Sequence, residues 1–171
     1  MNNKDVFITH ELNKFGSISE ELKAKGYNFH YKIMDMKVIE SNRYISRQLS
    51  IPLASKVFYL KKIRIVKEEP KTIENVYIDC RLVDGFVKEQ IDDVSFYHVL
   101  EEKYGYKTIR SEEEILIVEA SEEERNLLHL KGKEEILLIK GITYIDNIKP
   151  FEYFEISSVT DFYHFRSVKT I

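Results

Sequence analysis

The chain has 171 residues, 43% of them hydrophobic and 32% charged, which is an ordinary balance for one soluble globular domain with a proper core. The formal net charge is −3, with 26 Lys and Arg against 29 Asp and Glu, whereas domains that bind nucleic acid are usually basic. No apolar run approaches the length of a membrane span, and the N-terminus lacks the apolar core of a signal peptide. We expect a single domain over residues 1–171 that by itself contacts neither DNA nor a membrane.

The predicted elements alternate between strands and short helices, without repeats or linkers. In chain order they are a helix over 17–25 that Gly26 ends, a strand over 28–40, a helix over 41–49 capped by Ser41, strands over 55–67 and 71–80, a loop with one helical turn over 82–91, a helix over 95–105, a strand over 107–119 kinked or bulged near Ser111, a helix over 121–130, and strands over 133–146 and 149–160. Ser17 or Ser19 is the candidate cap of the first helix. Ser121 and Glu124 match a capping box.

Hairpin connections dominate this order, and Asp146-Asn147 is a typical turn between the last two strands. Strands that are joined by hairpins pair antiparallel. The sequence therefore predicts an α+β fold with a mainly antiparallel sheet, flanked by short helices that lie on one side of it.

The hairpin within residues 59–78 carries charges on an apolar face. Lys62 and Arg64 are two residues apart on the first strand, so their side chains point to the same face, and Glu74 falls on the second strand. The other positions on that face are apolar: Phe58, Leu60 and Val66 on the first strand, and Val76, Ile78 and Cys80 on the second. Charges rarely sit there without a partner or a ligand. An internal ion pair, which these residues alone favour, and a ligand site both stay open.

Catalytic patterns are weak. The five histidines have no metal-ligand spacing: His10, His30, His98, His129 and His164. The sequence contains no glycine-rich phosphate loop and no Gly-x-Ser-x-Gly elbow. Cys80 is the only cysteine, which excludes an intramolecular disulfide, suits the reducing cytoplasm and predicts a buried side chain. We expect no cofactor, no metal and no enzymatic activity.

Six sequence blocks over residues 8–166 occur in a family-specific order. They are FGSISEELKAKGY, FYLKKIRIVKEEP, TIENVYI, VSFYHVLEEKYGY, the block from ASEEERN to PFEYFEI, and DFYHF. In this order and spacing they resemble the UTRA domain, the effector-binding domain of bacterial GntR-type transcriptional regulators of the HutC subfamily. The resemblance implies a chorismate lyase-like α+β fold, a small-molecule pocket against an antiparallel sheet, and a homodimer, for which the strands at 107–119 and 133–145 offer an edge or a face.

The resemblance also implies which residues bind the effector. The phosphate of a sugar phosphate would be held by two cations and by the turn that opens the first helix, because a helix N-terminus and nearby cations complete an anion site. The implied effector-binding residues are Gly16, Ser17, Ile18, Ser19, Lys62, Arg64, Glu74, Ser95, Tyr97, Glu152 and Ser158. Ser95 would also cap its helix. Ser158 stands where some sugar-phosphate sensors have tyrosine, and Lys62 replaces an arginine, which removes bidentate phosphate binding there.

The family carries an N-terminal winged helix, and these residues contain none. We therefore expect either a piece of a longer regulator or a free-standing sensor. The predicted function is to bind a small anionic metabolite, such as a sugar phosphate, and to control the DNA binding of an attached winged helix. The alternatives are a chorismate lyase-like enzyme, whose cationic pocket would hold an aromatic dicarboxylate, and a pure dimerisation module with a vestigial pocket.

Overall fold

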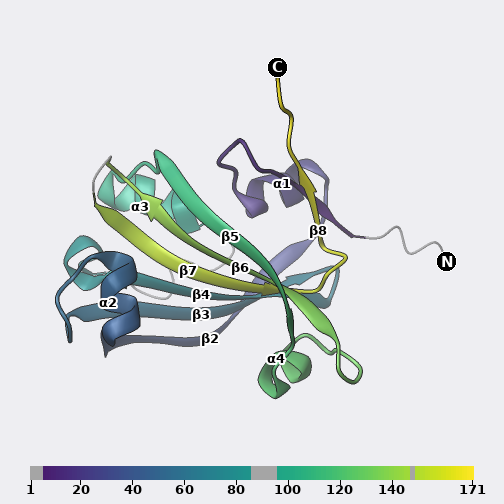
Figure 1. Ribbon diagram of the computed structural model, residues 1–171, viewed down its shortest axis with the longest axis horizontal. Helices are drawn as coiled ribbons and strands as arrows, with labels where there is room; N and C mark the ends of the chain where they lie inside the picture. Colours follow the sequence, from purple (N-terminus) through teal and green to yellow (C-terminus); the bar gives the residue numbers. More distant parts are fainter. Residues whose placement is uncertain (1–5, 86–95, 147–148) are drawn as a thin grey trace.

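The computed structural model describes residues 6–85, 96–146 and 149–171, with the side chains of residues 96 and 97 outside the described part (Figure 1). The elements in chain order are β1 (Ile8–Glu11), α1 (Ile18–Ala24), β2 (Phe29–Glu40), α2 (Arg43–Leu49), β3 (Lys56–Val66), β4 (Glu69–Asp79), the 3-10 turn η1 (Cys80–Leu82), α3 (Phe96–Tyr104), β5 (Arg110–Glu119), α4 (Glu122–Leu127), β6 (Glu135–Tyr144), β7 (Pro150–Ser158) and β8 (Tyr163–Arg166). Among the described residues, no helix has the length and apolar character needed to cross a membrane.

Six strands form one sheet in the order β2-β3-β4-β7-β6-β5, and every neighbouring pair is antiparallel. This confirms the predicted α+β class with a mainly antiparallel sheet. A second, two-stranded sheet was not predicted: β1 pairs in parallel with β8, and Ile8 lies opposite Tyr163. We call this pair the terminal ribbon. It lies beside α1 at one end of the main sheet (Figure 1).

The β3–β4 hairpin sets the positions of the charged residues. Its two turn residues, Lys67 and Glu68, have φ angles of 49° and 65°, the left-handed conformation that a two-residue hairpin turn of the commonest type requires. The resulting register places Lys62 opposite Glu74. An irregularity between Arg64 and Ile65 interrupts the pairing. The two cations and the carboxylate therefore share a face, as the alternation of residues predicts.

Both faces of the sheet are apolar, so helices cover both of them. The larger core includes Leu60 and Val76 of the sheet together with Leu22 of α1 and Leu100 of α3. Two smaller cores lie on the other face, one beneath Ile45 and Leu49 of α2 and one around Ile63, Ile73 and Leu128. Figure 1 shows α1 and α3 on one side of the sheet and α2 and α4 on the other. The prediction that the helices lie on one side was wrong.

The N-terminal caps of three helices, α4, α2 and α1, can be compared with the predicted ones. Ser121 and Glu124 do form a capping box at α4. The cap of α2 is Asn42, whose side chain accepts a hydrogen bond from the Ile45 N–H, and not Ser41, which is buried and accepts a hydrogen bond from Ser46. Ser17 occupies the cap position of α1, although its side chain makes no capping hydrogen bond.

Three further predictions concern strands and turns. The strand was predicted to be kinked or bulged near Ser111, and the bulge is absent, since β5 pairs with β6 in continuous register from Arg110 to Glu119. Cys80 is half-buried and packs against the larger core. The helical turn predicted over 82–91 lies partly outside the described residues. Asn147, in the predicted turn of the last hairpin, lies wholly outside them.

Candidate ligand-binding site

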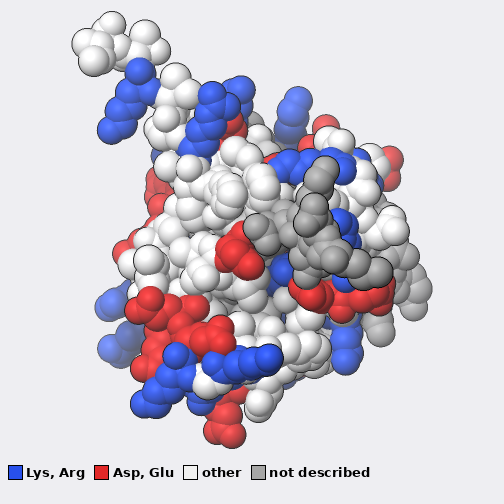
Figure 2. All heavy atoms as spheres, turned by 90° about the vertical axis from the view of Figure 1, so that its right-hand side faces the viewer, with Lys and Arg blue, Asp and Glu red and all other residues white. Residues whose placement is uncertain are grey.

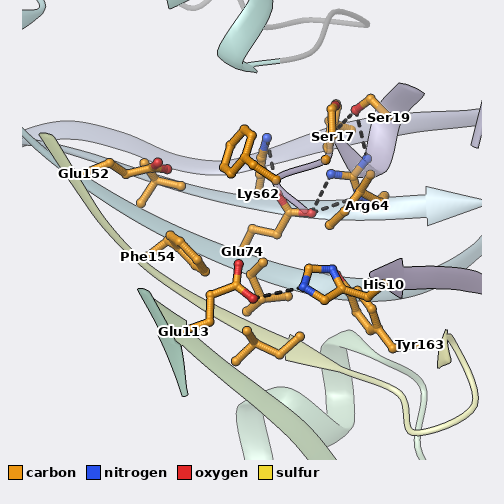
Figure 3. Close-up of a pocket in the computed structure, with 17 residues that line it drawn as sticks. His10, Ser17, Ser19, Lys62, Arg64, Glu74, Glu113, Glu152, Phe154 and Tyr163 are labelled. Carbon is orange, nitrogen blue, oxygen red and sulfur yellow. Dashed lines mark hydrogen bonds and ion pairs between the residues drawn. The ribbon is translucent and has the colours of Figure 1, made fainter. Parts of the chain in front are cut away.

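A cavity of about 80 Å³ lies between the main sheet and the chain that leads from β1 into α1 (Figure 3). The sheet forms its floor, and the terminal ribbon together with residues 15–19 forms the opposite wall. Its lining consists of His10, Phe15, Gly16, Ser17, Ile18, Ser19, Tyr31, Lys62, Arg64, Glu74, Val76, Glu113, Ile139, Glu152, Phe154, Ile156 and Tyr163. Side chains from all six strands of the main sheet and from the ribbon therefore converge on one space.

Lys62, Arg64 and Glu74 form an ion-paired group on the floor of the cavity, which we call the charged cluster. Arg64 Nε and Nη2 each lie 2.9 Å from Glu74 Oε1, and Lys62 Nζ lies 3.3 Å from Glu74 Oε2. Thr72 Oγ1 donates a further hydrogen bond of 3.0 Å to Glu74. The three charged residues are only 3%, 3% and 6% exposed. The internal ion pair that the sequence favoured is therefore present, and it borders a cavity.

Tyr31 and Ser19 hold the two cations from the other side. Lys62 Nζ lies 4.0 Å from the centroid of the Tyr31 ring, and the Arg64 guanidinium lies 4.5 Å from it. Arg64 Nη1 donates a 3.1 Å hydrogen bond to Ser19 Oγ, which also shares a 2.7 Å hydrogen bond with the Tyr31 hydroxyl. Tyr31 lies opposite Arg64 in the β2–β3 pairing, so the sheet register brings the ring to the cation.

Within the charged cluster, the neighbouring charges shift the pKa values of Glu74 and Arg64 more than burial does. Burial alone would raise the pKa of the Glu74 carboxyl, but Arg64 and Lys62, with the hydrogen bonds from Arg64 and Thr72, lower it to about 2. Burial alone would likewise lower the pKa of Arg64, and the charge of Glu74 raises it above its ordinary value. Glu74 and Arg64 are therefore both charged at neutral pH. Two cations against one carboxylate leave the cluster with a net charge of +1.

The other end of the cavity carries carboxylates. Glu113 of β5 lies 3.0 Å from Nε2 of His10, a contact that joins the ribbon to the edge of the main sheet. Glu152 of β7 is 2% exposed and accepts a 2.9 Å hydrogen bond from Thr143. Figure 3 shows Glu152 and Glu113 on the side of the cavity away from Arg64. The cavity therefore has a cationic end and an acidic end.

The floor between these ends is apolar and consists of Val76, Ile139, Phe154 and Ile156. The ring of Phe154 lies across the glycine opposite it in the β6–β7 pairing, Gly141. A Cβ atom at Gly141 would meet the Phe154 ring at 2.4 Å and the Glu112 carbonyl oxygen at 2.8 Å. The absence of a side chain at this position thus fixes where the ring lies.

Eight of the predicted effector-binding residues line the cavity: Gly16, Ser17, Ile18, Ser19, Lys62, Arg64, Glu74 and Glu152. Ser158 does not. It is fully buried, and its hydroxyl donates to the carbonyl oxygens of Lys71 and Val159. Ser95 and the side chain of Tyr97 lie outside the described residues.

Sequence reasoning missed His10, Phe15, Tyr31, Glu113 and Tyr163, which also line the cavity. Tyr31 could have been found, because it lies on the half-buried face of β2, between the exposed His30 and Lys32, and pairs with Arg64. His10 and Tyr163 could not, because they belong to the parallel ribbon, which leaves no local pattern. Among the described residues, no group of His, Cys, Asp and Glu side chains is placed to hold a metal ion.

A family model described as UTRA domain matches residues 24–164 of this chain. The chain belongs to the UTRA domain family. It is therefore an effector-binding domain of the kind found in GntR-family transcriptional regulators. This confirms the family that the six sequence blocks indicated.

Two curated relatives are transcriptional repressors. The chain is 25% identical over 162 residues to the mannosyl-D-glycerate transport/metabolism system repressor MngR of Escherichia coli (strain K12), a match that covers 95% of the chain and 67% of MngR. It is 26% identical over 137 residues to the HTH-type transcriptional repressor NagR of Bacillus subtilis (strain 168), covering 80% of the chain and 56% of NagR. This UTRA domain thus spans between half and two thirds of these relatives.

Solved structures share the fold. The effector domain of PhnF from Mycobacterium smegmatis superposes with a TM-score of 0.82 at 17% identity, covering 96% of this chain and all of that domain. A GntR-family transcriptional regulator from Enterococcus faecalis V583 superposes with a TM-score of 0.74 at 27% identity, covering 81% of this chain and 99% of the other. These likenesses confirm the α+β architecture.

Proposed function

We propose that this UTRA domain binds a small anionic metabolite, such as a sugar phosphate, in the cavity, and that binding changes the DNA affinity of an attached winged helix. The observation that carries the proposal is the charged cluster. Two buried cations and the carboxylate that they share lie on the floor of a cavity, where the cations can attract an anion.

The surroundings of the cluster support an anionic ligand that also has hydroxyl groups. Residues 16–19 line the cavity beside the cations, where the family resemblance places the phosphate. Glu152 and Glu113 at the other end can accept hydrogen bonds from sugar hydroxyls or an amine. The name of MngR contains mannosyl-D-glycerate, a sugar derivative that carries a carboxylate, so an anionic sugar derivative fits the proposal.

Lys61 and Lys62 offer a matched pair of variants for the test, because neighbouring residues of a strand point to opposite faces. Lys62 faces the cavity, whereas Lys61 pairs with Glu123 of α4 on the other face. In a thermal-shift screen of sugar phosphates and sugar acids, we expect a metabolite to raise the melting temperature of the wild type and of Lys61→Met. Lys62→Met should lose that response. An equal response of both variants would contradict a site at the cluster.

A chorismate lyase-like enzyme is the alternative. The relatives reported above are transcriptional repressors, which supports a regulatory role. Incubation of the domain with chorismate separates the two functions, because a lyase would release pyruvate and a sensor would leave the substrate intact. Catalytic release of pyruvate that is lost in Arg64→Ala would overturn the regulatory proposal.

We also propose that the domain forms a homodimer with one cavity in each copy. Of the two strand segments expected to associate, β5 is at an edge of the sheet, whereas β6 lies between β5 and β7. Ile117 on β5 is 65% exposed, and an apolar residue on an open strand edge favours pairing with a second copy. Sedimentation at micromolar concentration should show a dimer. Only the 20.3 kDa species would contradict this.

In this proposal an attached winged helix binds DNA, and this domain does not. On the face shown in Figure 2, basic and acidic side chains are interspersed and form no continuous basic surface. We expect the domain alone to lack specific operator binding in an anisotropy titration near physiological salt. Joining a winged helix to it should restore binding that responds to the effector. Such a regulator would act in the cytoplasm.

A further inference from the structure

Tyr163 carries a buried hydroxyl that has no hydrogen-bond partner among the described residues. The residue opens β8, lines the cavity and is 4% exposed. Figure 3 shows it beside His10, on the side of the cavity where Arg64 also lies. A buried hydroxyl without a partner destabilises a fold, so its presence needs an explanation.

Packing explains the ring of Tyr163 and not its hydroxyl. The ring stacks on Phe165 at 5.6 Å with an interplanar angle of 5°, and it meets Phe162 edge-on at 5.3 Å. His10 approaches the ring edge-on at 6.1 Å. Phenylalanine would make all three contacts. The oxygen atom therefore contributes nothing to this aromatic group.

The hydroxyl lies close to charged groups that line the cavity. The charges that act on it come from Glu74, Arg64 and Glu113, and the Tyr31 hydroxyl also acts on it. These four residues belong to four different strands, and every one of them lines the cavity. Burial raises the pKa of Tyr163, so the phenol is protonated at neutral pH and can donate a hydrogen bond.

We propose that Tyr163 is a further effector contact, whose hydroxyl donates a hydrogen bond to a phosphate or carboxylate oxygen of the bound anion. The inference rests on the proposed function and adds a residue from the terminal ribbon to a site otherwise built mainly by the main sheet. It has a structural consequence. Because Tyr163 pairs with Ile8 in the ribbon, an anion that bridges Tyr163 and Arg64 would tie the ribbon to the main sheet.

The test compares Tyr163→Phe with Tyr153→Phe, two substitutions that each remove one hydroxyl from a buried tyrosine. Tyr153 lies on the opposite face of the sheet, where its hydroxyl is 2.8 Å from that of Tyr44 and donates to Glu155. The probes are inorganic phosphate, glucose 6-phosphate and D-glycerate, which separate a phosphate from a carboxylate. Binding is measured by calorimetric titration, and the melting temperature of each variant is measured without a probe.

Two results are expected together. Without a probe, Tyr163→Phe melts at the wild-type temperature or above it, whereas Tyr153→Phe melts below it because its hydroxyl has partners. With the probe that binds the wild type most tightly, Tyr163→Phe binds roughly ten-fold or more weakly, the loss expected for a hydrogen bond to a charged group. Tyr153→Phe binds that probe like the wild type.

Three results would overturn the inference, and they are distinguishable. Tyr163→Phe that melts as far below the wild type as Tyr153→Phe would show that the hydroxyl already has a partner. Tyr163→Phe that binds the probe as tightly as the wild type would remove Tyr163 from the site and leave the proposed function standing. A wild type that binds none of the probes would overturn the anionic effector and, with it, this role of Tyr163.

Discussion

The two faces of the main sheet carry polar groups in different ways. On the face covered by α2, the rings of Tyr44, Tyr153, Tyr77 and Tyr59 form a row with successive centroids 5.7, 5.8 and 5.0 Å apart. On the opposite face, Lys62, Arg64 and Glu74 are packed beside a cavity. The first face carries a row of tyrosine hydroxyls, and the second buries a cluster of ions beside a cavity.

The partners of these polar groups differ in the same way. On the tyrosine face, Tyr153 donates to Glu155, and Tyr59 donates to Asn75. On the cavity face, two cations share Glu74, and the Tyr163 hydroxyl lacks a partner among the described residues. Hydroxyls that have partners within the fold stabilise it without a ligand, whereas buried cations and a donor without a partner among the described residues can interact with a ligand in the cavity. We therefore expect the tyrosine face to serve stability and the cavity face to serve ligand binding.

Glu74→Gln should give the largest effect, because it removes the charge of the carboxylate that both buried cations share. Breaking a buried ion pair in this way costs about 3 to 5 kcal/mol, and urea unfolding of the variant should show that loss. Inorganic phosphate should restore part of the stability. The control is Glu114→Gln, whose side chain is 66% exposed and pairs with Lys140 at 3.7 Å. Exposed pairs contribute about 0 to 1 kcal/mol, and a similar loss in both variants would contradict the account.

The pH dependence of unfolding should identify the same carboxylate. The pKa of Glu74 is lowered from 4.5 to about 2 in the folded chain, so the unfolded chain takes up the proton first as the pH falls. The stabilisation is complete above pH 4.5 and is lost between pH 4.5 and 2, by about 3 kcal/mol at 1.36 kcal/mol per pKa unit. Glu74→Gln should flatten the profile of unfolding free energy over this range. An unchanged slope would assign the acid sensitivity to other groups.

Gly141→Ala tests the apolar floor of the cavity. The new Cβ would lie 2.4 Å from the Phe154 ring, so the ring must move toward the cavity. Overpacking of this kind costs about 1 to 3 kcal/mol, and effector binding should weaken as well. Gly16→Ala is the control for stability, because its Cβ would meet no atom within 4 Å. If Gly141→Ala keeps the wild-type stability and binding, the Phe154 ring can move without loss of either, which would contradict this prediction.

Tyr44→Phe should give the smallest effect. Tyr44 is 46% exposed, and its hydroxyl shares a 2.8 Å hydrogen bond with Tyr153. The loss of this bond should lower the free energy of unfolding by about 1 kcal/mol, with no change in effector binding. A binding defect in Tyr44→Phe would show that the tyrosine face communicates with the cavity, and the division between the faces would fail.

The sequence predicted the part of the site that depends on local rules. Alternation along β3 and β4, joined by a two-residue turn, is enough to place Lys62 opposite Glu74. Hairpins also predict the antiparallel sheet, because each connection is short. The sequence also contained a signal that helices cover both faces of the sheet. Ile63 and Ile73 alternate with Lys62 and Glu74, so both faces of this hairpin needed cover, and that signal was present in the sequence.

The rest of the site depends on contacts between distant residues. His10 and Phe165 pair in the terminal ribbon although they are 155 positions apart, and a parallel pair of four-residue strands leaves no hairpin and no strong alternation in the sequence. His10 and Tyr163 were missed for this reason, and Glu113 was missed because its contact in the site is with His10, 103 positions away in the chain. The free hydroxyl of Tyr163 is also invisible in a sequence, because only the packed structure shows which polar atoms have partners.

The most direct test of the central claim is a crystal structure of the domain with tungstate, a phosphate analogue that anomalous scattering locates without ambiguity. The account predicts a bound anion in the cavity, in contact with Lys62 or Arg64 and within hydrogen-bonding distance of the Tyr163 hydroxyl. An anion bound only outside the cavity, with the charged cluster unchanged, would contradict the claim that the cluster is a binding site.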